Sequence, residues 1–258
     1  MILNEIIARK NTDLENGLFR IPLSELERKA FARPEPRDFR QALAAPGLSV
    51  IAEVKRASPS KGMMTGSFNY QKTAAAYEKG GASAISVLTE RNYFLGEDYY
   101  LTQIKEKAGI PVLRKDFIID ERQVLESRAL GADAILLIAA VLDDKAMLRL
   151  FALAGECGLH CLFEAHDGEE VKRIAACGAK MIGINNRNLQ TFAIDLGTFE
   201  RLLPLIPSEA FAVAESGISS PREAQRLRKA GADAVLIGEM LMRSDNPASL
   251  IKACREET

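Results

Sequence analysis

Six ionisable side chains lie at the ends of short apolar runs, and their types suit proton transfer on an anionic substrate. Glu53 and Lys55 end the run 49–54, and because they are two residues apart in a strand, they point to the same face. The others end four further apolar runs: Lys115, Glu164, Arg187 and Glu215. Carboxylates can act as bases, and ammonium or guanidinium groups can donate protons or hold anions.

Each of these residues also has a purely structural interpretation. A pair such as Glu53 and Lys55 can be an ordinary ion pair, and Arg187 can be a solvated loop charge. The whole set is harder to explain in this way, because burying so many charges together costs several kcal/mol per ion unless partners compensate. We therefore interpret the set as a catalytic or binding site.

The chain has few histidine and cysteine residues that could act as catalytic groups or metal ligands. The chain has two histidines, His160 and His166, and four cysteines that form no C-x-x-C pair: Cys157, Cys161, Cys177 and Cys254. No serine or cysteine lies in a nucleophile-elbow motif. We expect buried reduced thiols, neither a zinc site nor a histidine-dependent triad, and acid–base chemistry that uses carboxylates and lysines.

A glycine-led segment recurs along the chain and indicates how these side chains are positioned. It starts at residues 80, 131, 178 and 231, and each copy joins an amphipathic stretch to a short apolar run. Glycine can end a helix by adopting a positive φ, and the apolar run is typical of a buried parallel strand. The spacing fits two β–α units per repeat, so another strand is expected between each pair of copies.

Those strands are predicted at 110–114, 160–164 and 211–214, and the opening run 49–54 brings the total to eight. Eight alternating strands and helices predict an α/β fold, a single (β/α)₈ TIM barrel, in which side chains at the strand ends meet at one mouth. No G-x-G-x-x-G follows the first strand, which disfavours a dinucleotide-binding sheet. We expect one domain: residues 1–47 as a helical extension packed across one end, and 48–258 as the catalytic barrel.

Composition excludes several classes of partner. The 258 residues are 47% hydrophobic, and 34 Lys and Arg balance 35 Asp and Glu. This balance disfavours nucleic acid and anionic membranes as partners. The longest uncharged apolar stretch, 134–142, is far shorter than the roughly 20 residues of a membrane span. The N-terminal segment has a charged residue as early as Glu5 and lacks the apolar region of a secretory signal, so we expect a cytoplasmic location.

Two glycine turns predict a phosphate site. Gly217 follows the seventh strand and Gly238 the eighth, and the loops at these positions commonly bind phosphate in such barrels. A glycine permits close approach of backbone N–H groups to an anion. The loop 56–62 after the first strand adds hydroxyls and a cation, and is typical of a mobile clamp over an anionic substrate.

The chain resembles the indole-3-glycerol phosphate synthase family over essentially its whole length. The resemblance is carried by 51–62 (IAEVKRASPSKG), 84–90 (AISVLTE), 113–117 (LRKDF), 183–189 (GINNRNL), 214–218 (AESGI) and 235–238 (VLIG). Two positions depart from the family pattern: Gly96-Glu97 stands where a Gly-Ser pair is expected, and residue 239 is Glu where other members can have Ser. Because no isomerase segment follows, the resemblance leads us to expect the monofunctional form.

The resemblance implies a carboxy-lyase of tryptophan biosynthesis. Its substrate is 1-(2-carboxyphenylamino)-1-deoxyribulose 5-phosphate, which undergoes ring closure, decarboxylation and dehydration. Lys115 matches the family's general acid and Glu164 the residue that removes a proton during indole formation. Glu53 and Lys55 match further catalytic positions, and the division of work between the two lysines stays open. No metal or organic cofactor is expected.

The resemblance also implies the binding residues. The sugar and carboxylate are assigned to Asn185, Arg187, Glu215 and Ser216, the aromatic ring to Phe94, Phe117 and Leu189, and the phosphate to Ser58, Gly217, Gly238 and Glu239, with Lys55 as a further candidate. If backbone N–H groups hold the phosphate at residue 239, the Glu side chain should matter little. Ordinary core packing at the barrel rim remains the alternative for the three apolar residues, Leu189 above all.

Two other functions stay open. A Schiff-base aldolase on the same barrel would use Lys115 as a nucleophile, and borohydride trapping would reveal it. A non-catalytic sugar-phosphate sensor would not need the full set of acids and bases. The sequence leaves the oligomeric state, the rate-limiting step, the growth temperature and any pathway partner undecided, and a monomer is the working expectation.

Overall fold

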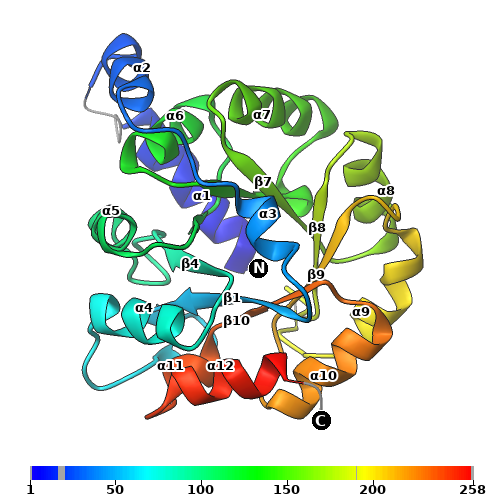
Figure 1. Cartoon of the computed structure of the whole chain (residues 1–258). Helices are drawn as coiled ribbons and strands as arrows, with labels where there is room; N and C mark the ends of the chain where they lie inside the picture. Colours follow the sequence, from blue (N-terminus) through cyan, green and yellow to red (C-terminus); the bar gives the residue numbers. More distant parts are fainter. Residues whose placement is uncertain (1, 17–20, 190, 257–258) are drawn as a thin grey trace.

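Eight parallel strands close into a barrel in the order β1-β10-β9-β8-β7-β6-β5-β4 (Figure 1). The computed structural model describes residues 2–16, 21–189 and 191–256. The barrel strands are β1 (Ser49–Val54), β4 (Ala84–Leu88), β5 (Val112–Lys115), β6 (Ala134–Ile138), β7 (His160–Ala165), β8 (Met181–Asn185), β9 (Phe211–Glu215) and β10 (Ala234–Ile237). The predicted (β/α)₈ fold is confirmed. The largest boundary change is in β5, predicted at 110–114, which starts at Val112, after Pro111, because proline has no N–H to donate to a sheet.

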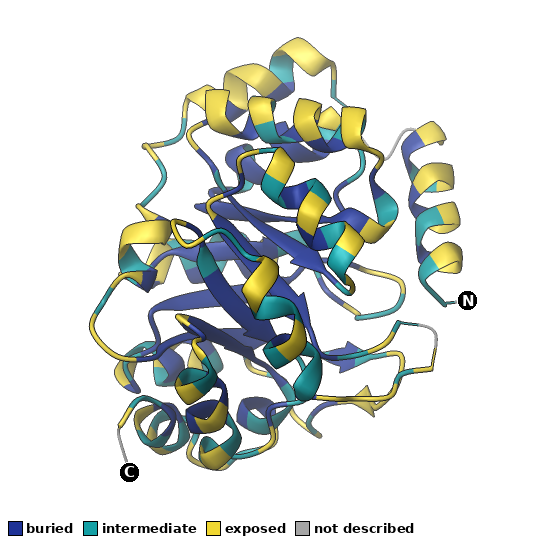
Figure 2. Ribbon diagram, turned by 90° about the vertical axis from the view of Figure 1, so that its right-hand side faces the viewer, coloured by how far each residue is buried: buried dark blue, intermediate teal, exposed yellow. Residues whose placement is uncertain are grey.

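Helices surround the barrel, with buried faces toward the strands and exposed faces toward solvent (Figure 2). They are α4 (Tyr70–Lys79), α5 (Asp98–Lys107), α6 (Glu121–Leu130), α7 (Asp144–Glu156), α8 (Gly168–Ala176), α9 (Gly197–Leu202), α10 (Pro221–Ala230), α11 (Glu239–Met242) and α12 (Pro247–Arg255), with short 3₁₀ turns η1 (Ala139–Val141) and η2 (Leu203–Leu205). A small hairpin, β2 (Ala57–Ser58) and β3 (Gly62–Met63), lies in the loop after β1. Gly131 and Gly231 end α6 and α10 in the left-handed conformation that only glycine adopts cheaply.

The strands are buried on both faces, which explains their continuous apolar runs. Alternate residues pack inward to fill the barrel, among them Ile51, Leu113, Leu162 and Val213. Their neighbours along each strand pack outward against the helices. The interior is therefore a filled core, and the ionisable residues that line the cavity lie where the strands end.

The N-terminal helices are α1 (Ile2–Glu15), α2 (Leu23–Phe31) and α3 (Phe39–Leu43). The sequence predicted that they pack across one end of the barrel, but they contact different parts of it. In α3, Phe39 and Leu43 join the barrel interior at the start of the strands. Helix α2 packs along α6, while α1 reaches the opposite end, where Lys10 pairs with Asp116 at 2.8 Å. An amphipathic pattern predicts that a helix buries one face, but not which surface covers it.

Among the residues that the structure describes, no helix is long and apolar enough to cross a membrane.

Candidate active site

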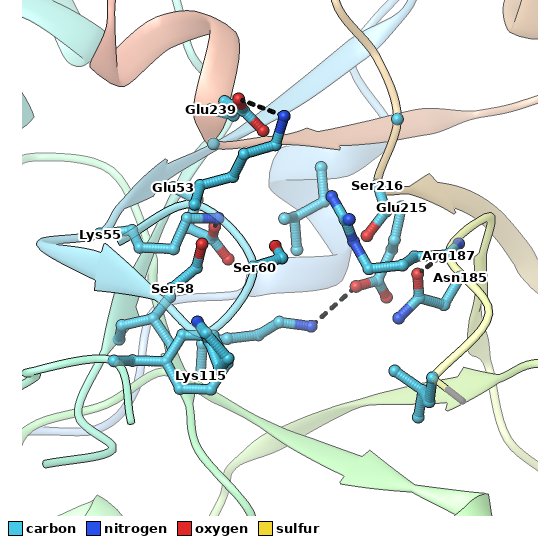
Figure 3. Close-up of a pocket in the computed structure, with 18 of the residues that line it drawn as sticks. Glu53, Lys55, Ser58, Ser60, Lys115, Asn185, Arg187, Glu215, Ser216 and Glu239 are labelled. Carbon is cyan, nitrogen blue, oxygen red and sulfur yellow. Dashed lines mark hydrogen bonds and ion pairs between the residues drawn. The ribbon is translucent and has the colours of Figure 1, made fainter. Parts of the chain in front are cut away.

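A cavity of about 470 Å³ opens at the carboxyl ends of the strands, and all six ionisable side chains singled out in the sequence line it. Figure 3 labels all of them except Glu164. They come from the ends of five strands and meet because parallel strands end at the same side of a barrel. The six are Glu53 from β1 and Lys55 just after it, Lys115 from β5, Glu164 from β7, Arg187 after β8 and Glu215 from β9.

Lys115 is held between two buried carboxylates. Its Nζ lies 2.7 Å from Glu164 Oε2 and 2.8 Å from Glu215 Oε2. Burial disfavours the charged amine, but the charges of Glu164, Glu215 and Glu53 outweigh burial and raise the pKa of Lys115 above its ordinary value. The side chain is therefore an ammonium group, able to donate a proton.

The two carboxylates that contact Lys115 have opposite pKa shifts. Burial disfavours the charged form of Glu164, but the Lys115 ammonium and His166 lower the pKa of Glu164 below its usual range. Asn185 Nδ2 also donates to Glu164 Oε1 at 2.9 Å. Burial dominates at Glu215 and, despite Lys115, raises the pKa of that carboxyl to about 7. Neighbouring groups with separated pKa values are typical of acid–base sites.

A second ammonium–carboxylate pair lies beside the first. Lys55 Nζ donates to Glu53 Oε1 at 2.6 Å, and both side chains are largely buried. The space for this pair depends on Gly238, because a Cβ at that position would overlap with the Glu53 carboxylate. The sequence predicted that Gly238 lets the backbone approach a phosphate. It did not predict that the absence of a side chain at this position also makes room for Glu53.

Gly183 was not predicted to have a functional role. It lies inside β8, and a Cβ there would overlap with Glu215 Oε1. A glycine inside a strand often marks a position that another group approaches closely. The presence of a glycine within the apolar run was the only feature of the sequence that could have indicated this role.

The residues assigned to the aromatic ring form an apolar wall. Phe94, Phe117 and Leu189 all line the cavity, and the Phe94 and Phe117 ring centroids are 6.3 Å apart. Helix α1 adds three apolar lining residues that sequence reasoning did not assign: Ile2, Leu3 and Ile6.

The residues assigned to the phosphate lie on the same cavity: Ser58, Gly217, Gly238 and Glu239, together with Ser216. The turn after β9 is tight, with φ of +64° at Ser216 and +80° at Gly217. The Glu239 carboxylate lies 3.5 Å from Lys61 Nζ and 3.3 Å from Arg243 Nε. Both cations also line the cavity, and Arg243 was not identified from the sequence.

Comparison with known proteins identifies the family. The model of the family described as "Indole-3-glycerol phosphate synthase" matches residues 3–254. The chain belongs to this family. The resemblance inferred from the sequence is thereby confirmed, and the chain is a carboxy-lyase of tryptophan biosynthesis.

Individual relatives agree. The chain is 45% identical to an indole-3-glycerol phosphate synthase of Alkaliphilus metalliredigens, over 99% of this chain and 98% of the relative. A second indole-3-glycerol phosphate synthase, from Endomicrobium trichonymphae, is 43% identical over 99% of this chain and 100% of its own length.

Solved structures support the fold alone. 3-Hexulose-6-phosphate synthase from Salmonella typhimurium has a TM-score of 0.63 at 18% identity, covering 80% of this chain and 96% of that one. Thiamine phosphate pyrophosphorylase from Pyrococcus furiosus has a TM-score of 0.61 at 17% identity, with 84% and 96% covered. At these sequence identities, the two structures support the barrel fold but not the role of any residue in this chain.

Proposed function

We propose that this cavity closes the pyrrole ring of indole, using Lys115 as the general acid and Glu164 as the general base. The observation that carries the proposal is the Lys115 ammonium group, held 2.7 Å from Glu164 inside a cavity with an aromatic wall. The substrate is 1-(2-carboxyphenylamino)-1-deoxyribulose 5-phosphate, an aromatic carboxylate joined to a sugar phosphate. Its ring, carboxylate and phosphate need an apolar slot and cations within one cavity.

Ring closure begins when the ring carbon that bears the carboxylate attacks the C2 carbonyl of the sugar. The carbonyl oxygen gains negative charge, and Lys115 donates a proton to it, leaving a hydroxyl group. Loss of CO₂ returns the bonding electrons to the ring and restores aromaticity. Elimination of the hydroxyl as water then needs a proton on the leaving oxygen, which a cavity ammonium group (Lys55 or Lys115) donates, and the loss of a proton from the substrate, which Glu164 accepts. Its lowered pKa keeps Glu164 ionised before this step.

Lys55 is proposed to act on the phosphate side of the cavity. A Cβ on Gly238 would lie 3.0 Å from Lys55 Nζ, so the ammonium group is next to the loop after β10. We propose that Ser58, the backbone of Gly217, Gly238 and Glu239, and the Lys55 ammonium hold the phosphate. Lys61 and Arg243 neutralise the Glu239 carboxylate, so the acidic side chain does not leave an uncompensated charge there.

The sugar and carboxylate are proposed to contact Asn185, Arg187, Glu215 and Ser216, and the aromatic ring Phe94, Phe117 and Leu189. Residues 1–47 and the barrel 48–258 are proposed to work as one unit, because α1 adds apolar residues to the cavity and Lys10 pairs with Asp116, next to Lys115. We further propose that the protein acts in the cytoplasm as a monomer and needs no metal or organic cofactor.

The Schiff-base alternative fits the geometry less well. An amine must lose its proton before it can attack a carbonyl, whereas the surrounding carboxylates keep Lys115 protonated. Borohydride added together with a ketose phosphate should therefore trap no covalent adduct on Lys115.

The direct test is to mix the purified protein with the substrate in the presence of EDTA and to follow indole fluorescence. We expect fluorescence to rise at the same rate with and without EDTA. Loss of the signal in EDTA, restored by a divalent metal, would overturn the metal-free mechanism. No signal in either condition from a folded protein would overturn the ring-closure proposal.

Glu215 also predicts a pH-dependent effect on stability. Because its folded pKa is raised from 4.5 to about 7, its stabilising contribution is full below pH 4.5 and is lost as the pH rises through 7. Glu215→Gln should therefore gain stability relative to wild type between pH 5 and pH 8, on the order of 2 kcal/mol or roughly 5 °C in Tm. Thermal unfolding at the two pH values measures the change.

The matched control is Glu27→Gln, a solvent-exposed carboxyl on α2. A Tm difference between Glu215→Gln and wild type that stays constant from pH 5 to pH 8 would contradict the raised pKa.

A further inference from the structure

His166 lies directly behind Glu164 and is not part of the mechanism above. It follows Glu164 by two residues at the end of β7, so both side chains leave the strand on the same side. Its Nε2 is 3.2 Å from Glu164 Oε1, and its Nδ1 is 3.0 Å from Glu170 Oε2 in α8. The same Glu170 oxygen accepts the His166 backbone N–H at 2.7 Å. The imidazole therefore spans carboxylates of two elements, with 14% of its side chain exposed.

We propose that His166 is a positioning residue for Glu164: its ring holds one carboxylate oxygen so that the other faces Lys115 and the substrate. This inference rests on the proposed role of Glu164 as the base.

The two oxygens of Glu164 have different surroundings. Oε1 accepts from Asn185 Nδ2 at 2.9 Å and contacts His166 Nε2, whereas Oε2 contacts the Lys115 ammonium. Rotation about the last bond of a glutamate side chain has only a broad, shallow preference. The position of the reactive oxygen therefore depends on contacts to its partner oxygen, and His166 supplies one of them.

The position of Glu170 is itself fixed. The Asp167 side chain caps α8 and accepts the backbone N–H groups of Glu169 and Glu170, each at 2.9 Å. Glu170 is thus in the first turn of a capped helix, where its carboxylate can hold Nδ1 of His166. The chain of contacts runs from the helix through the imidazole to the catalytic carboxylate.

Charge supports the same role. Burial disfavours the protonated ring, but Glu164 and Glu170 raise the pKa of His166 to about 10. A second cavity, of about 600 Å³, lies beside the ring, and its other charged lining residues are Asp167, Glu170, Arg187, Asp195 and Arg201. An imidazolium has no free lone pair, so it cannot accept a proton from Glu164. It acts as a fixed cation that favours the ionised carboxylate.

Kinetics of His166→Asn test the inference. Asparagine can replace Nδ1 toward Glu170 but does not reach as far as Nε2, so the variant removes both the charge and the contact with Glu164. We expect kcat to fall about tenfold with KM within about twofold of wild type. We also expect the acid limb of the kcat–pH profile to move up by about one unit or more, because a cation within 4–6 Å lowers a carboxyl pKa by that amount. Glu170→Gln should move both readouts in the same direction by less.

His160→Asn is the matched control. His160 is the only other histidine of the chain, and it lies at the start of β7, 3.4 Å from Asp38. This variant should keep the wild-type kcat and pH profile. A wild-type profile in His166→Asn would overturn the inference.

NMR gives a readout that is independent of activity. With two histidines in the chain, their imidazole nitrogen signals can be assigned from the two variants. We expect His166 to remain doubly protonated up to pH 8, and a His166 ring that is neutral at pH 7 would overturn the inference. Glu164→Gln separates the two proposals. If it keeps wild-type kcat, the proposed role of Glu164 fails. If it loses activity while His166→Asn has a wild-type profile, only the inference about His166 fails.

Discussion

Lys115→Ala is expected to lower kcat by at least about 100-fold at saturating substrate, because the variant loses the proton donor for ring closure. The two other lysines that line the described cavity, Lys55 and Lys61, each pair with a carboxylate of their own. Lys55, which directly follows β1, is engaged by Glu53 at 2.6 Å and lies next to the loop after β10. Stopped-flow or continuous indole fluorescence measures the effect.

Removing Lys115 also leaves Glu164 and Glu215 buried without their shared cation, so folding must be checked by thermal unfolding. Lys115→Gln fills more of the space with a neutral group and should lose a similar factor in kcat. Lys172→Ala, at an exposed lysine on α8 that pairs with Glu169, is the matched control and should retain wild-type kcat. Turnover within a few fold of wild type in a folded Lys115→Ala variant would contradict the general-acid role.

The sequence predicted the fold and the clustering of charges for one physical reason. Strands in this barrel are buried on both faces, so they read as apolar runs, and a charge at the end of a run marks the rim. Glu53, Lys115 and Glu164 were found in this way, and the structure places them on one cavity. Counting the repeats was sufficient to establish the barrel, because each glycine-led segment marks a helix end followed by a strand.

Contacts between elements distant in the chain were not predictable in the same way. The apolar face of α1 has no sequence feature that assigns it to the mouth of the barrel, yet Leu3 and Ile6 line the cavity. Gly183 is required by a carboxylate on the neighbouring strand, which a linear pattern does not reveal. His166 was considered only as a metal ligand or a triad member, and its contact with Glu164 depends on how β7 and α8 pack.

The opposite pKa shifts of Glu164 and Glu215 also could not be predicted, since both residues follow apolar strands. What separates them is the number of stabilising partners. Glu164 has Lys115, Asn185 and His166 around it, whereas Glu215 Oε1 is buried with no hydrogen-bond partner in the described structure. The better-stabilised carboxylate stays ionised, and this is the state that a base needs before it accepts a proton.

Glu164→Gln is therefore expected to lower kcat by about 10²- to 10⁴-fold, with KM within a few fold. The amide has nearly the same shape and can still contact Asn185, but it cannot accept the proton released on dehydration. Indole fluorescence gives the loss of turnover, and CO₂ release measured in a single turnover shows where the reaction stops. Glu156→Gln, at an exposed carboxyl at the end of α7, is the matched control.

The two readouts together place Glu164 in the sequence of steps. If CO₂ is released at a normal rate while indole fluorescence fails to rise, the variant completes ring closure and stops before dehydration, as expected for the base of the last step. If both signals are lost, Glu164 is needed earlier, and its contact with Lys115 then matters for delivery of the first proton. Normal indole formation would contradict both roles and would shift the search for the base to Glu215, whose carboxyl has a pKa of about 7 and shares the same lysine.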